Sequence, residues 1–219
     1  MPVHRKDAKL PAIRKSVIPS STPTELIIVM NNKELEGSIR PEGASERIVT
    51  SDRIGRGYAF VRGAMEARGD IVLLLHSDTL LPEKWDRAIT RALDSGRASC
   101  GAFSLSFDMS SLYLRALILL SDAFYYLTGE VWGDRAIFMR REILRQCLDA
   151  MNVPLLEDVR VSECLRERGR ILLLKEKVVT SAEGFRTKGM LRHAWKALRC
   201  RVLYALGASP QSMYDYYYS

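Results

Sequence analysis

Two periodicities alternate along the chain. Short apolar runs predict buried strands over 25–30, 47–50, 71–75, 136–139, 171–174 and 178–180, and residues 98–107 alternate small and apolar side chains as a strand does. Apolar or small residues at helical spacing predict helices over 58–68, 82–95, 112–127, 141–150, 158–168 and 189–206. Strands that alternate with helices favour an α/β fold with parallel strand pairs, in which the later strands can be mixed.

The two ends of the chain lack this alternation. Residues 1–23 combine prolines, Ser, Thr and basic residues, and we interpret them as a basic arm. Residues 186–219 form a basic amphipathic helix and a tyrosine-rich tail, which is either flexible or an oligomer contact. The pattern therefore predicts one α/β domain over 24–185 between two basic appendages, and a homo-oligomer remains open.

Composition narrows the class of protein. The chain has 219 residues, of which 47% are hydrophobic and 27% charged, a balance that excludes a wholly disordered protein. The longest apolar run, 116–120, is far shorter than the roughly 20 residues of a membrane span. No apolar segment opens the chain, so we expect no secretory signal and a cytoplasmic protein, with a peripheral position at the inner membrane face as an open alternative.

The net charge of +7 is unevenly distributed. Residues 1–23 hold five Lys or Arg and one Asp (+4), residues 186–219 hold six and one (+5), and the middle carries the remaining −2. A nucleic-acid binder spreads basic residues over its folded face, so this distribution argues against one. It fits an enzyme that handles anionic ligands, or a protein that rests on an anionic membrane.

Cysteine spacing gives no metal or redox motif. The four cysteines, at 100, 147, 164 and 200, include no pair separated by two residues. We therefore expect reduced thiols.

A polar cluster follows the apolar run 71–75. Ligands bind at the carboxyl ends of strands in open α/β sheets, and residues two apart on an extended chain point the same way. His76 and Asp78 therefore face one crevice, where they suit a divalent cation that also binds a diphosphate. The alternative is that Asp78 caps the next helix.

Three further segments carry candidate chemistry. Gly55-Arg56-Gly57 precedes a helix and suits a phosphate, with Arg62 as a further cation, although a tight turn explains the glycines equally. Glu157-Asp158 lies at the start of a helix, where the acids provide a general base or cap the helix. The segment Trp132-Gly133-Asp134-Arg135 fits a sugar site or a loop salt bridge.

The order of these motifs resembles the family 2 glycosyltransferases with the GT-A fold. The motifs are Gly-Arg-Gly-x-Ala-x-x-x-Gly, His-Ser-Asp-Thr-x-x-Pro, Gly-Asp-x-Ala-Ile-Phe-x-Arg-Arg and Pro-Leu-x-Glu-Asp-Val, over about 47–215. The chain looks similar to the small arsenosugar-biosynthesis-type or radical-SAM/selenodomain-associated subgroup, and 55–69 also resembles polyprenyl-phosphate sugar synthases.

The resemblance implies a role for each motif. Asp78 matches the last acid of the element that binds a divalent metal (Mn or Mg) on the donor diphosphate, while His76 is a ligand or shapes the site. Asp158 matches the catalytic base, and Glu157 would orient it or the acceptor. The loop from Trp132 to Arg135 matches the acceptor side. The residues implied in donor binding are Asn31, Gly55, Arg56, Gly57, Arg62, Ser77, Asp78, Arg186 and Lys188.

The amino-terminal part departs from the family pattern. Family members open with a strand, a helix, and a second strand that ends in Asp, whereas here Asn31-Asn32 follows the strand 25–30 and nothing before it reads as the first unit. We therefore expect a GT-A fold whose first βα unit is reduced or missing. Asn31 can still hydrogen-bond a nucleotide base.

Together these features imply an inverting, metal-dependent enzyme. It would transfer a sugar from a nucleotide-sugar to a hydroxyl of a small or lipid-linked acceptor. The alternatives are a catalytically degenerate relative that binds a ligand, and a membrane-surface scaffold. The helix 189–206 packs on the domain with a solvated basic face, or lies on a membrane through Trp195.

Overall fold

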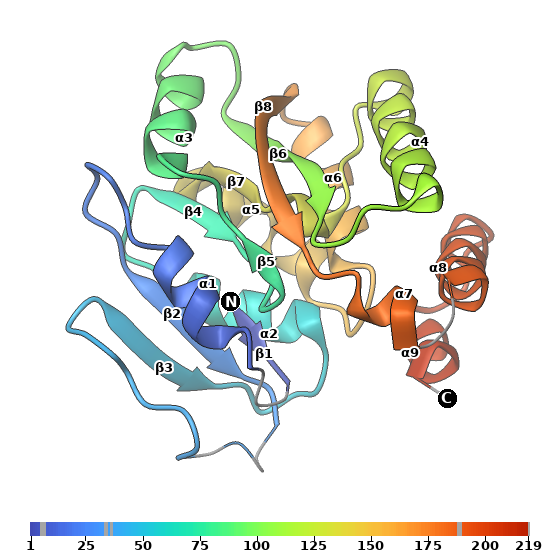
Figure 1. The fold of residues 1–219 in the computed structure, drawn as a ribbon, viewed down its shortest axis with the longest axis horizontal. Coiled ribbons are helices and arrows are strands. Elements are labelled where there is room, and N and C mark those ends of the chain that lie inside the picture. The colour runs from blue at the N-terminus through green and yellow to red at the C-terminus, as the bar shows by residue number, and fades with distance from the viewer. Residues whose placement is uncertain (5–7, 33–34, 36, 188–189, 219) are drawn as a thin grey trace.

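The computed structural model describes residues 1–4, 8–32, 35, 37–187 and 190–218 (Figure 1). Its strands are β1 (Pro2–Val3), β2 (Leu26–Met30), β3 (Glu46–Thr50), β4 (Ile71–Leu74), β5 (Thr79–Leu80), β6 (Cys100–Phe107), β7 (Ile137–Arg140) and β8 (Ile171–Thr180). Its helices are α1 (Leu10–Ser16), α2 (Arg56–Glu66), α3 (Trp85–Asp94), α4 (Leu112–Thr128), the 3-10 turn η2 (Gly133–Arg135), α5 (Arg141–Met151), α6 (Glu157–Arg166), α7 (Glu183–Thr187), α8 (Met190–Ala205) and α9 (Pro210–Tyr218).

Two sheets form the centre of the molecule. In the first, β1, β2 and β3 pair in parallel, in that order. In the second, with the order β4-β7-β6-β8-β5, only β6 and β8 are parallel, and the other three pairs are antiparallel. The predicted α/β class is therefore confirmed, with mixed pairing in the later half of the chain.

Helices cover both faces of the strands. Neighbouring residues on one strand contribute to opposite cores: Phe138 packs with α1 and α3, whereas Ile137 and Met139 pack with α4, α5 and α6. The β2 strand alternates likewise, since Ile28 joins the α1 side and Val29 packs against α2. This alternation explains why the strand segments look apolar throughout.

The amino-terminal segment is part of the fold, and our interpretation of it as an arm is wrong. The β1 strand pairs with β2 through Val29 and Met30, and Val3, Leu10 and Ile13 are buried in the core. The first βα unit is therefore reduced but present. A cavity of about 510 Å³ lies between β2, β4, α2 and α3.

Three smaller expectations are also corrected. The segments 171–174 and 178–180 form one strand, β8, whose register against β6 shifts between Phe103 and Ser104. The helix expected from Pro82 starts at Trp85, after Lys84 adopts a left-handed conformation. The tyrosine-rich tail is helical, as α9.

Two tertiary contacts fix the segment between α5 and α6. A disulfide joins Cys147 to Cys164, so the expectation of four reduced thiols is wrong for this pair. Leu155 packs with Cys200 of α8 and Met213 of α9. The carboxyl-terminal helices therefore pack on the domain, beside the start of α6.

The exposed side of α8 is apolar in part. Trp195 and Val202 of α8, and Leu206 directly after it, are each about half exposed or more. Within the described part of the chain, no helix combines the length and the apolar character needed to cross a bilayer.

Candidate functional site

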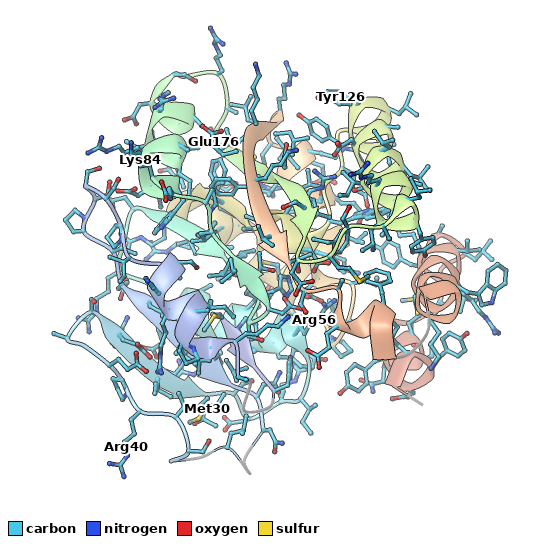
Figure 2. All side chains as sticks on the ribbon, viewed as in Figure 1. Met30, Arg40, Arg56, Lys84, Tyr126 and Glu176 are labelled. Atoms are coloured by element: carbon cyan, nitrogen blue, oxygen red, sulfur yellow. A yellow bond between two sulfur atoms is a disulfide. The ribbon has the colours of Figure 1, made fainter. Side chains whose placement is uncertain are left out.

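The polar residues that follow separate strands meet around one arginine. His4 follows β1, Asn31 follows β2, and Asp78 follows β4. Arg56, the first residue of α2, lies near the centre of the molecule, with side-chain oxygens gathered beside it (Figure 2). This is the strand end at which open α/β sheets bind ligands.

Arg56 forms an ion pair with the start of α6. Its Nε lies 3.1 Å from Oε1 of Glu157, whose side chain is almost fully buried. The positive charge of Arg56 also acts on the pKa values of four neighbours from three other segments, namely His4, His76, Asp78 and Asp134. Arg56 is thus the cation around which the site is organised.

Four carboxylates share this region. Burial raises the pKa of Glu157 to about 7, against the opposing charge of Arg56, and the charges of Asp158 and Asp134 raise it further. Loss of hydration and the charge of Asp78 raise the pKa of Asp134 to about 7, although its side chain still reaches solvent. Burial also raises the pKa of Asp78, while Thr79 Oγ1 donates to its Oδ1 at 3.2 Å. The site holds more negative charge than Arg56 offsets.

The glycines flanking Arg56 allow close packing of protein on protein. A Cβ on Gly57 would lie 2.3 Å from the carbonyl oxygens of both Met151 and Val153, and one on Gly55 would lie 2.6 Å from Cα of Pro154. Gly55 also has a φ of 143°. The structure therefore explains both glycines by the approach of α2 to the segment before α6, whereas the sequence suggested approach to a phosphate.

Asn31 secures the same turn. Its buried side chain donates from Nδ2 to Gly55 O at 2.6 Å, and its Oδ1 accepts from Gly55 N at 3.4 Å. These two bonds engage the amide that we expected to face a nucleotide base. Asn31 thus positions the Gly55–Gly57 turn.

His4 is a site residue that the sequence did not indicate. Burial and the charge of Arg56 lower its pKa to about 4, so the ring is neutral near pH 7. Its Nε2 is buried and has no hydrogen-bond partner among the described residues. The strand before His4 has only two residues, too few to show the alternation that predicts a strand. The sequence therefore contains no indication that His4 lies at a strand end.

His76 lies within reach of the charge of Arg56, with its ring against another ring. Its side chain is buried and meets Phe60 edge-on, with ring centroids 5.1 Å apart. Burial lowers the pKa of His76 well below its usual value. This packing supports a role in shaping the site. In the part of the chain that the structure describes, no three His, Cys, Asp or Glu side chains are grouped to hold a metal ion.

The predicted acceptor residues in and beside the turn η2 point to two different places. Asp134 joins the carboxylates, whereas Arg135 is 1% exposed and turns to α4, where its Nη2 donates to Ser121 Oγ at 2.8 Å and to Asp122 Oδ1 at 2.5 Å. Trp132 stacks at a tilt on Phe124 of α4, with centroids 5.8 Å apart. Arg135 therefore ties the turn to α4 through a salt bridge.

Comparison with known proteins decides the family. The model of the family described as "Glycosyl transferase family 2" matches residues 1–150, more than half of the chain. The chain belongs to this family. The match begins at residue 1, which agrees with a first βα unit inside the domain.

Solved structures with low sequence identity share the fold of this family 2 glycosyltransferase. TarS 1-349 from S. aureus, in complex with UDP-GlcNAc, has a TM-score of 0.60 and 14% identity over 82% of this chain and 56% of its own. GalNAc-T7 with UDP, GalNAc and Mn²⁺ has a TM-score of 0.60 and 13% identity over 82% of this chain and 42% of its own. The chain thus spans about half the length of these structures, and no curated protein matches it.

Three of the expected donor residues are not placed in the cluster. Arg62 forms an ion pair with Glu66 one helical turn away on α2. The side chain of Arg186 and the whole of Lys188 lie outside the described residues. Ser77 is half-buried between His76 and Asp78.

The buried Glu157 makes the stability of this glycosyltransferase depend on pH. A carboxyl whose pKa rises to about 7 on folding stabilises the protein below its unfolded value, 4.5, and this contribution is lost as the pH rises through 7. His4, with a folded pKa of about 4, acts in the opposite direction because it destabilises the protein as the pH falls below its unfolded value of 6.5. In the wild type, the contributions of Glu157 and His4 to the pH dependence of the unfolding free energy therefore have opposite signs.

Replacing Glu157 with Gln should separate the effect of Glu157 on stability from that of His4. We expect the unfolding free energy of wild type minus that of Glu157→Gln to fall by about 3 kcal/mol between pH 4.5 and pH 7.5. Denaturant titrations of both proteins across this range measure the difference. Glu167→Gln, at an exposed position on the end of the same helix, should give a constant difference. A constant difference for Glu157→Gln as well would contradict the raised pKa.

Proposed function

We propose that this chain transfers a sugar from a nucleotide-diphosphate sugar to a hydroxyl acceptor, with inversion at the anomeric carbon and with a divalent metal. The observation that carries the proposal is the meeting of Asp78, Asp134, Glu157 and Asp158 around Arg56 at the strand ends of a family 2 glycosyltransferase fold. The similarity of its motifs to those of the arsenosugar-type subgroup supports a small or lipid-linked acceptor.

The residues present fit a divalent cation on the donor side. Asp78 and Asp134 carry hard oxygen donors of the kind that Mg²⁺ and Mn²⁺ prefer, and they lie close enough that, besides burial, the negative charge of Asp78 raises the pKa of Asp134. We propose that Asp78 holds the cation together with oxygens of the donor diphosphate. When bound, the cation offsets the negative charge of the leaving diphosphate.

Asp158 is the proposed general base. It lies half-buried in the first turn of α6, where the helix dipole stabilises its anion. Asp158 takes the proton of the acceptor hydroxyl, the oxygen bonds to the anomeric carbon from the face opposite the diphosphate, and the bond to the diphosphate breaks. Glu157 orients this turn through its ion pair with Arg56.

The main argument for the alternative, a catalytically degenerate relative that only binds a ligand, no longer holds. It rested on a missing first βα unit, and β1 and α1 are present. The replacement of the family Asp by Asn31 is explained by the two bonds of Asn31 to Gly55. No described feature favours a second function over sugar transfer.

Calorimetric titration tests donor binding directly. We expect the protein to bind a uridine-diphosphate sugar in the presence of Mn²⁺, since the two similar structures above carry UDP-GlcNAc and UDP with GalNAc. Asp78→Asn should weaken binding at least about tenfold, because one charged ligand is lost. Asp94→Asn, at an exposed position on α3, is the matched control. Failure to bind any nucleotide-sugar, with or without Mn²⁺, would refute the proposal.

A further inference from the structure

Helix α4 is apolar on both its sides. Its inner side packs Leu114 and Tyr125 against the domain. Its outer side leaves five large hydrophobic side chains 65–85% exposed, namely Leu112, Leu119, Leu120, Tyr126 and Leu127. A helix that is apolar all round is normally buried in a protein core or a membrane, so the solvent-facing side of α4 is unusual.

The exposed residues form one continuous stripe. With Ala116 and Ala123, they recur every three or four positions and fall, at 100° per residue, within an arc of about 140°. The stripe runs the length of a helix of 17 residues, about 25 Å. Arg115 is the one charged residue on this arc, at its edge.

Arginines flank the stripe, and the two acids at the carboxyl-terminal half of α4 and just after it are paired with arginines. Asp122 of α4 is paired with Arg135, and Glu130, after the helix, is paired with Arg201 of α8. Exposed Arg166 lies beside Gly129, at the carboxyl end of α4. The surface therefore offers apolar side chains with cations at its margins.

Helix α8 extends this surface. Arg201 of α8 lies 5.9 Å from the ring of Phe124 of α4, so the two helices are neighbours, and in Figure 1 they line the same edge of the molecule, away from β1–β3. Among the described side chains, Trp195, Arg199 and Val202 of α8 are exposed, and so is Leu206 directly after it; these four positions recur at helical spacing. An aromatic, a cation and aliphatic side chains in this order are typical of interfacial helices.

We propose that the outer side of α4, with the exposed side of α8, docks on an anionic lipid surface. The stripe enters the boundary between headgroups and acyl chains, and the arginines at its margins meet lipid phosphates. This position brings the membrane to the acceptor side of the candidate site, because Arg135 and Trp132 join the turn η2 to the inner side of α4. The proposal does not depend on sugar transfer.

Co-sedimentation with vesicles tests it. The full chain should pellet with vesicles of phosphatidylcholine and phosphatidylglycerol, and much less with phosphatidylcholine alone. The double variant Leu119→Glu/Leu120→Glu should lose at least tenfold in vesicle affinity. Its thermal unfolding should match that of wild type, because both side chains are solvent-exposed. The matched control Ile18→Glu/Met65→Glu changes two equally exposed hydrophobic residues outside the stripe, and it should bind vesicles as wild type does.

Three results would overturn the proposal. The first is wild-type protein that stays in the supernatant or binds without regard to phosphatidylglycerol. The second is vesicle binding by Leu119→Glu/Leu120→Glu equal to that of wild type. The third is light scattering that shows a dimer in wild type and a monomer in the variant, since the stripe would then be the interface with a second copy of the chain.

Discussion

Asp158→Asn is expected to lower the turnover number for sugar transfer by about 10²–10⁴-fold, the range typical of losing a positioned general base. Asparagine keeps the size of the side chain and its place in the first turn of α6 but cannot accept the acceptor proton. Because the proposed donor contacts come from Asp78 and Arg56, the dissociation constant for the nucleotide-sugar should change little. Steady-state kinetics and calorimetric titration of the same preparation measure the two quantities.

A loss of turnover without a loss of donor affinity indicates a catalytic role of Asp158, whereas a structural defect would lower both. Glu167→Gln removes a negative charge near the other end of the same helix, at an exposed position, and should leave both quantities unchanged. A fall in donor affinity as large as the fall in turnover would assign Asp158 to donor binding. Unchanged turnover would show that another group takes the proton.

Gly57→Ala is expected to destabilise the protein by at least about 3 kcal/mol, the upper range of overpacking. Alanine in place of a helical glycine normally stabilises by roughly 1 kcal/mol, so the sign is reversed here. The added Cβ would lie 2.3 Å from two backbone carbonyl oxygens, which cannot move away as a flexible side chain does, and 2.9 Å from Cβ of Glu157. Either α2 or the segment before α6 must shift, and that segment leads directly into Glu157 and Asp158, the first residues of α6.

Two other glycines provide a graded comparison. At Gly63, also in α2, the added Cβ would lie 2.9 Å from Cγ2 of Val29 and 4.0 Å from Cγ2 of Ile27, and a smaller loss is expected because these are side chains that can adjust. At Gly43 it would meet nothing within 4 Å, so no loss is expected. Denaturant unfolding of the three alanine variants measures the series. Equal stabilities would show that the α2 contact tolerates a methyl group.

The order of elements could be predicted because it depends on local pattern. Apolar runs placed β2, β3, β4 and β6 within two residues of their observed bounds, and helical spacing did the same for α2, α4, α5 and α8. The position of Asp78 after β4 and of Asp158 in the first turn of α6 followed from the same pattern. A strand of two residues has no period, and so β1 was not predicted.

The sequence by itself determined the fold class, the family resemblance and the residue types at the strand ends. Only the tertiary structure decided what those residues do to one another, because each relevant contact joins segments distant in the chain. Gly57 faces Met151, Cys147 is bonded to Cys164, and Arg135 is bonded to Asp122 of α4. The exposed side of α4 was equally hidden in the sequence. An apolar pattern predicts that a helix forms, whereas the packing of the whole chain decides which of its sides remains in solvent.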